Sequence, residues 1–230
     1  MEILLIAIVV TLGLLFNIWL IKKAFGFGNG SSGDSVKHKA KASVDIEKQI
    51  ADLGNIGIHL NKGVTFEDLY LSFSKETYED DPYVLLLSMM GSEIEAEPWG
   101  RHFSDDVWYL DYECIEGDGS YTRIVENLAR IAGMMDRIHD LSDKVDLKVA
   151  HANLSFTLDG KRHEFSPLID NDWADAETVS TLTKLFEATV DDGRKFWASD
   201  EGQANSFVFL NDADANQLNL VVPLLVKRFT

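Results

Sequence analysis

The sequence predicts an α+β protein in which a single N-terminal transmembrane helix and a flexible Gly/Ser linker precede a soluble domain of mixed or antiparallel strands with packed helices. Three features support this prediction: a charge-free apolar run near the N-terminus, a glycine- and serine-rich stretch after it, and amphipathic helix patterns that alternate with short hairpin-connected strands. The expected parts are the anchor at 1–22, the linker at 23–42 and the soluble domain at 43–230. The soluble domain is one unit, or two sub-lobes that meet near 138–144.

Residues 3–21 are predicted to cross a lipid bilayer, because a helix of this length, at about 1.5 Å of rise per residue, roughly matches the ~30 Å hydrocarbon core. A cleaved signal peptide would need a basic residue before a shorter run, whereas here Glu2 precedes the run and two lysines follow it. Trp19 fits an interfacial position, and Asn17 reaches either the headgroups or a neighbouring helix. The residues that define the expected anchor are Ile3, Leu12, Asn17, Trp19, Ile21, Lys22 and Lys23.

The charges that flank this run predict its orientation. No Lys or Arg precedes it, and positively charged flanks stay in the cytoplasm. We therefore expect a single-pass protein of a bacterial inner membrane, with the bilayer as one partner and the soluble domain facing the cytoplasm. The basic residues that follow the run are Lys22, Lys23, Lys37, Lys39 and Lys41.

The linker contains a literal G-x-G-x-x-G pattern at Gly28, Gly30 and Gly33. A dinucleotide-binding fingerprint needs a strand before this pattern and a helix directly after it. Here the predicted membrane helix precedes and a basic polar stretch follows, so we interpret residues 26–35 as a flexible tether.

The net charge excludes one class of partner and favours another. The chain has 21 Lys and Arg against 38 Asp and Glu, a formal net charge of −17. Residues 1–42 carry 5 basic and 2 acidic side chains, so residues 43–230 carry 16 and 36, a net charge of −20. Nucleic-acid binding needs clustered Lys and Arg. We therefore expect no nucleic-acid partner, and a basic partner if there is one.

The first half of the soluble domain is predicted to contain helices and strands in alternation. Ser43 and Thr65 are each expected to cap a helix, and Gly54 to end the first one. The apolar run 83–90 fits a helix or a strand, since its periodicity favours neither. The strands expected in this half are residues 56–60 and residues 107–115.

The second half continues the alternation. Residues 144–158 are predicted to be one strand with a bulge near His151, where the parity of its apolar residues changes. Asp159 and Gly160 are typical of a two-residue hairpin turn. The other elements expected here are a helix at 120–137, a strand at 161–165, a helix at 175–189, strands at 196–198 and 207–210, and a closing helix capped by Asp212.

Four carboxylates gather around the end of the 107–115 strand. Asp111 and Glu113 project from one face of this strand, and Glu116 and Asp118 follow in the turn. They would bind a divalent cation or act as a general acid/base pair, or they would form the solvated face of an antiparallel strand.

Recognised catalytic and metal-binding motifs do not occur in the sequence. The six histidines have no metal-ligand spacing, and there is no nucleophile elbow, P-loop or kinase signature. Cys114, the only cysteine, falls on the apolar face of its strand, where a thiol is expected to be inert. The sequence therefore predicts no catalytic residue, no metal site and no cofactor.

Two tryptophans lie in acidic, loop-like contexts. Trp99 follows Glu97 and Pro98, and Trp173 follows Asp172. Exposed tryptophan surrounded by acid is typical of a binding hot spot for a basic protein, although both rings would equally cover the edge of the core.

Two stretches carry a resemblance: WYLDYECIEGDGSY at 108–121 and FWASDEGQANSFVFLNDADANQL at 196–218. Together with the acidic α+β pattern, which extends over much of 56–220, they resemble small bacterial proteins of the toxin-immunity kind and related uncharacterised families. The resemblance implies a non-catalytic protein that neutralises a basic toxin by binding it, and it assigns no functional residues.

These features favour a membrane-anchored, non-catalytic protein-binding module of a bacterium, in the form of an immunity or accessory factor that binds a basic protein. Two alternatives stay open: a metal-dependent hydrolase that uses the clustered carboxylates, and a structural subunit of an inner-membrane complex. The oligomeric state is not predicted. The expected protein-binding surface consists of Trp99, Asp111, Glu113, Glu116, Asp118 and Trp173.

Overall fold

The computed structural model describes residues 42–199, 201–222 and 227–228. The predicted anchor and nearly all of the predicted linker lie outside these residues, so the transmembrane helix, its orientation and the tether stay predictions. Within the described ranges, every helix is too short or too polar to cross a bilayer.

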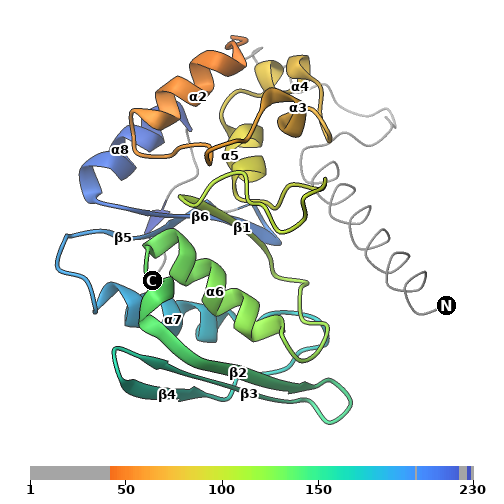
Figure 1. Cartoon of the computed structure of the whole chain (residues 1–230), viewed down its shortest axis with the longest axis vertical. Helices are drawn as coiled ribbons and strands as arrows, with labels where there is room; N and C mark the ends of the chain where they lie inside the picture. Colours follow the sequence, from red (N-terminus) through yellow and green to blue (C-terminus); the bar gives the residue numbers. More distant parts are fainter. Residues whose placement is uncertain (1–41, 200, 223–226, 229–230) are drawn as a thin grey trace, which may run out of the picture.

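The described chain is α+β with two antiparallel sheets, which confirms the predicted class. Figure 1 shows its layers: helices α2 to α5 and α8 cover one face of a sheet of order β1-β6-β5-β7, helices α6 and α7 cover its other face, and the sheet β2-β3-β4 lies beyond α6 and α7. The helices are α2 (Ile46–Gly54), α3 (Phe66–Leu69), α4 (Lys75–Asp80), α5 (Val84–Met90), α6 (Ser120–Ala132), η1 (Met135–Arg137), α7 (Ala176–Glu187) and α8 (Asp212–Val221). The strands are β1 (Val107–Asp111), β2 (Ile138–Asp146), β3 (His151–Leu158), β4 (Lys161–Phe165), β5 (Lys195–Ala198), β6 (Ala204–Leu210) and β7 (Lys227–Arg228).

The β1-β6-β5-β7 sheet separates two hydrophobic cores. On β6, Phe207 and Phe209 belong to the core with α6 and α7, whereas Val208 and Leu210 belong to the core with α2 and α5. All four side chains are buried. A strand buried on both faces reads as a continuous apolar run, which explains the SFVFL sequence of β6. Each such side chain contributes about 1.5–3 kcal/mol of burial free energy.

Several local predictions are confirmed by the backbone. Thr65 and Asp68 form a reciprocal capping box at the start of α3, and Asp175 caps α7 by accepting a hydrogen bond from Glu177 N. Asp159 and Gly160 have φ angles of 51° and 77°, as a two-residue turn between β3 and β4 requires. The ambiguous 83–90 run is helical, as α5.

The predicted strand at 56–60 is wrong. Ile56 and Ile58 are buried, as an alternating strand would have them, but the backbone has no neighbouring strand. Ile58 N donates to Leu53 O at the end of α2, and His59 N donates to the Asp106 carboxylate. Alternating burial therefore arises here from a turn packed on the core.

The predicted single strand at 144–158 is also wrong, because it is two strands, β2 and β3, joined by a turn at 147–150. Leu147 and Val149 are 41% and 69% exposed, so these apolar residues belong to the turn, although their alternation is typical of a strand. The irregularity in register lies in β2, between His139 and Ser142, rather than near His151. The predicted sub-lobe boundary near 138–144 falls within β2.

Several element ends differ from their predictions. Asp45, not Ser43, occupies the N-cap position of α2, and β6 begins at Ala204 rather than at residue 207. Helix α6 ends at Ala132, because Gly133 adopts a left-handed conformation (φ 69°) that terminates it. Strand β1 ends at Asp111, whose carboxylate accepts a hydrogen bond from Glu113 N and turns the chain. Asn211 caps α8, one residue before the expected Asp212.

Candidate functional site

A cleft of about 520 Å³ lies between residues 93–102 and helix α6, along strand β1. Glu93 and His102 pair as an isolated antiparallel bridge, and Ile94 N donates to Arg101 O at 2.7 Å, so residues 93–102 form a hairpin. We call the cavity the β1 cleft and this segment the 93–102 hairpin. The apolar side chains that line the β1 cleft come from well-separated parts of the chain and include Phe73, Met89, Phe103, Trp108 and Ile124.

Gly91 brings the end of α5 against the edge of β1. Its carbonyl accepts a hydrogen bond from Tyr109 N at 2.9 Å. A Cβ atom at position 91 would lie 2.4 Å from Tyr109 N, which is far inside van der Waals contact, so only glycine allows this approach. The contact fixes one end of the cleft.

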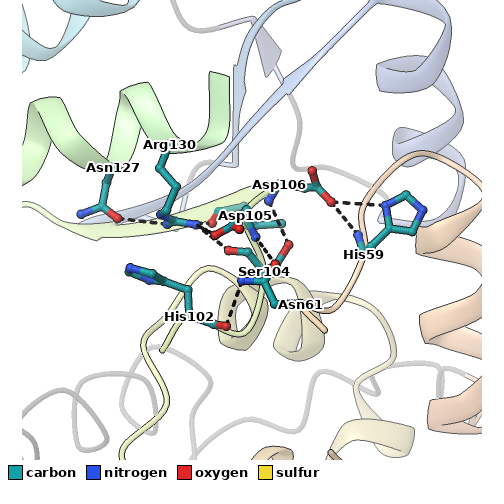
Figure 2. Close-up of polar contacts among 9 residues, drawn as sticks. His59, Asn61, His102, Ser104, Asp105, Asp106, Asn127 and Arg130 are labelled. Carbon is teal, nitrogen blue, oxygen red and sulfur yellow. Dashed lines mark hydrogen bonds and ion pairs between the residues drawn. The ribbon is translucent and has the colours of Figure 1, made fainter. Parts of the chain in front are cut away.

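Arg130, on α6, bonds the segment before β1 and the start of β1, as Figure 2 shows. Its guanidinium donates to the carbonyls of Ser104 (2.5 Å) and Val107 (3.3 Å) and to Asn127 Oδ1 (3.0 Å), and it forms an ion pair with Asp105 (3.3 Å). These bonds join α6, β1 and the segment before β1. We call these residues the Arg130 network.

The segment before β1 is also held from its opposite side (Figure 2). Asn61 Nδ2 donates to His102 O at 3.1 Å, and Asp105 N donates to Asn61 Oδ1 at the same distance. His59 N and Nδ1 contact the Asp106 carboxylate at 2.8 and 3.3 Å. The base of the 93–102 hairpin is therefore held between Asn61 on one side and the Arg130 network on the other.

Two buried nitrogens in this region have no hydrogen-bond partner among the described residues: His102 Nδ1 and Arg130 Nε. His102 lines the β1 cleft. Burial, and then the positive charge of Arg130, lower the pKa of His102, so its imidazole is neutral at pH 7. A neutral imidazole offers a ligand one donor and one acceptor.

More acidic than basic side chains line the β1 cleft. Glu93, Glu95 and Asp111 line it together with a single arginine, Arg123. In the described part of the chain, neither Glu93 nor Glu95 has an ion-pair partner within 4 Å. Burial raises the pKa of Glu95, which means that its negative charge is incompletely solvated. A cation entering the cleft would relieve this cost.

The side chains of Cys114, Ser92 and Ser120 in the cleft are either protonated or engaged in hydrogen bonds. Burial raises the pKa of the Cys114 thiol to about 12, so it is not a thiolate nucleophile at neutral pH. The Ser92 hydroxyl donates to Ser88 O, and that of Ser120 accepts from the backbone of Glu116. In the ranges that the structure describes, no three His, Cys, Asp or Glu side chains converge as metal ligands.

The six residues predicted as a binding surface are only partly brought together. Asp111 lines the β1 cleft, and Trp99, 61% exposed, lies on the 93–102 hairpin that forms one wall. Glu113 and Trp173 pair through their backbones beyond the end of β1, and Trp173 is 38% exposed.

The other two acidic residues lie near the start of α6. Glu116 is exposed. Asp118 faces the second sheet instead, where it accepts hydrogen bonds from Lys144 Nζ at 2.5 Å and Val145 N at 2.7 Å. It therefore has its own partners and does not belong to the cleft.

Several cleft residues were missed at the level of the sequence. Glu93 and Glu95 flank the buried Ile94 in an alternating E-I-E-A-E pattern, which is a signal for an exposed hairpin wall. No local pattern singles out His102, Arg123 or Asn127, because they meet only through the packing of α6 against β1.

A scan against protein-family models, a search of curated proteins and a search of solved structures each found no match to this chain. The resemblance to toxin-immunity proteins therefore stays a prediction.

Proposed function

We propose that this chain is an acidic, membrane-anchored binding module that holds a basic segment of a partner protein in the β1 cleft. The observation that carries the proposal is the pair of carboxylates, Glu93 and Glu95, which line an apolar cleft and have no ion-pair partner within 4 Å among the described residues. The anchor, the inner-membrane location and the cytoplasmic orientation are part of the proposal and rest on residues 3–21 and the lysines after them.

Three physical effects favour a basic partner. The net charge of −20 over residues 43–230 attracts a cationic protein over a range set by the Debye length, about 8–10 Å. The aromatic lining at Phe103 and Trp108 provides the apolar contact that usually dominates binding energy. The lone charge of Glu95 becomes favourable once a lysine or arginine enters, because ion pairs are stronger where water is partly excluded.

The experiment is a selection for peptide ligands. The full chain in detergent is screened against a displayed library of random nine-residue peptides, and enriched sequences are synthesised. We expect enriched peptides to contain a Lys or Arg, and hydrogen exchange to slow in residues 93–102 and α6 when they bind. Enrichment of peptides without a basic residue, or protection elsewhere in the chain, would overturn the proposal.

A matched pair of variants separates the cleft from the general acidity of the chain. E93Q/E95Q removes two charges from the cleft, and E164Q/D191N removes two exposed charges from β4 and from the loop before β5. We expect E93Q/E95Q to weaken an enriched basic peptide about tenfold at low salt, and E164Q/D191N to change its affinity less than about twofold. Equal effects in the two variants would contradict a cleft-specific role.

A further inference from the structure

We infer that the partner segment binds as an extended strand that pairs with the outer edge of β1, with one of its residues opposite Leu110. This inference rests on the proposed function and adds the conformation and register of the bound segment. It follows from the hydrogen-bonding groups that β1 leaves open along the cleft.

Among the described residues, β1 is an edge of its sheet, since β6 is its one strand partner there. In an antiparallel pair, backbone groups of alternate residues point toward the partner and away from it. Tyr112 N donates to Gln203 O, next to the β1–β6 pairing, so even-numbered residues face β6. Odd-numbered residues therefore face the open side. Two contacts confirm this parity: Tyr109 N donates to Gly91 O, and Val107 O accepts from Arg130.

The outward-facing groups of β1 divide into closed and open ones. Val107 O and Tyr109 N are occupied by Arg130 and Gly91. Tyr109 O and Asp111 N have no hydrogen-bond partner in the ranges that the structure describes, and both residues line the β1 cleft. An open carbonyl and an open amide, two residues apart on a sheet edge, are the groups that a peptide pairs with when it adds a strand.

The positions of these two groups determine the register of the added strand. In a parallel pair, one residue of the incoming strand donates to the carbonyl before its opposite residue and accepts from the amide after it. In an antiparallel pair, the two residues that flank a non-hydrogen-bonded residue bond the same carbonyl and the same amide. In both directions, Tyr109 O and Asp111 N are these two groups when a residue of the segment lies opposite Leu110.

The register also predicts which side chains the segment carries. The residue opposite Leu110 would point to the same face as Leu110, toward α6 and the apolar side chains of Trp108 and Ile124. Its two neighbours would point to the other face, the side of α5 from which the 93–102 hairpin extends with Glu93 and Glu95. The expected motif is therefore an apolar residue next to a lysine or arginine.

The first test removes peptide hydrogen bonds without altering the protein. Each backbone amide of an enriched peptide is N-methylated in turn, and affinity for the full chain is measured by fluorescence anisotropy. Methylation of the amide that donates to Tyr109 O should weaken binding about tenfold, whereas methylation of the residues on either side should have little effect, since their amides point away from β1. Equal tolerance at every position would overturn strand addition.

A second test removes the open amide of the protein. D111P eliminates Asp111 N–H, and proline is tolerated where an edge amide faces outward. D111A keeps this amide and loses the same carboxylate, so it is the matched control. We expect D111P to bind the peptide about tenfold more weakly than D111A, with circular dichroism showing that both variants are folded. Equal affinities would overturn the role of Asp111 N.

A dimer of this chain that the peptide dissociates would show that a second copy occupies the edge instead, and would overturn the inference. If peptides bind with the expected charge dependence but fail both tests, the proposed function stands and the strand inference falls.

Discussion

The two halves of the outer edge of β1 differ in whether their backbone groups have hydrogen-bond partners. The first half is closed, because Arg130 bonds Val107 O and Gly91 bonds Tyr109 N. The second half, Tyr109 O and Asp111 N, opens into a 520 Å³ cleft lined by Glu93 and Glu95. Sheet edges are commonly covered to prevent unwanted pairing. The proposed binding site is the open half of this edge, beside carboxylates without an ion-pair partner in the described ranges.

The buried carboxyl group of Glu201 sharpens this comparison. Burial raises its pKa, as it does for Glu95, but three hydroxyl groups donate to the Glu201 carboxylate, those of Ser88, Ser199 and Ser206. Glu95 has no hydrogen-bond or ion-pair partner in the described ranges. The buried acid of the interior has hydrogen-bond donors, whereas a cation would have to supply the partner of the cleft acid under the proposed function.

The largest expected loss of stability comes from removing Arg130, which occupies the closed half of the β1 edge. R130M removes four contacts and leaves the carbonyls of Ser104 and Val107 without a partner in a region that is largely buried. We expect a loss of about 3 kcal/mol in the free energy of unfolding, measured by urea denaturation. K148M removes a positive charge from an exposed turn and should cost less than about 0.5 kcal/mol. Similar losses for both variants would mean that the Arg130 network is not structural.

The next largest loss of stability is expected when Gly91 is replaced. G91A places a Cβ atom 2.4 Å from Tyr109 N and 2.8 Å from the carbonyl carbon of Trp108, so α5 and β1 must separate. We expect a loss of about 2 kcal/mol in unfolding free energy and faster exchange of the Tyr109 amide with solvent. G54A is the control, because the nearest atom to its Cβ would be a His59 side-chain carbon at 3.7 Å. An unchanged Tyr109 exchange rate in G91A would contradict the closed half.

A smaller, pH-dependent effect is expected at Glu201. Because its pKa is raised in the folded state, its contribution to stability is complete below the unfolded value of 4.5 and is lost as the pH rises through the folded pKa. E201Q should therefore match the wild-type chain at pH 4 and exceed it at pH 7 by on the order of 1 kcal/mol. Urea denaturation at both pH values measures this difference. E201Q should bind peptides as the wild-type chain does, and a stability gain that is equal at both pH values would contradict the assignment.

The smallest stability effect is expected at Glu95, and there the binding effect has the opposite sign. E95Q should gain roughly a few tenths of a kcal/mol at pH 7, with no gain at pH 4, because the raised pKa has the same direction as that of Glu201. It should also weaken the basic peptide about threefold. Thermal unfolding and anisotropy together test both. A variant that gains stability and keeps full affinity would place the bound cation elsewhere.

Local signals were sufficient for elements whose ends are determined by nearby residues. Thr65, Asp159–Gly160 and Asp175 were correct because caps and tight turns are hydrogen-bonded over two to four residues. The errors at 56–60 and 144–158 have one physical cause. The apolar pattern of a sequence does not show which backbone groups are hydrogen-bonded to another strand. A turn packed on the core and an apolar hairpin tip were therefore both predicted to be strands.

The predicted binding surface shows the same limit. Asp111 and Trp99 belong to the cleft region because β1 and the 93–102 hairpin form its walls. Asp118 instead forms an ion pair with Lys144 on β2, a strand that the sequence pattern predicted to be continuous with β3. Carboxylates that are close in sequence point to different sheets in the fold.

The sequence alone determined the acidic charge, the α+β alternation, the local caps and turns and the expected apolar anchor, because these depend on composition and on interactions within a few residues. Only the tertiary structure decided which half of the β1 edge is open and which carboxylates lack a partner. Both depend on Arg130, Gly91 and the 93–102 hairpin meeting β1 across long stretches of chain, and such contacts leave no periodic trace in a single sequence.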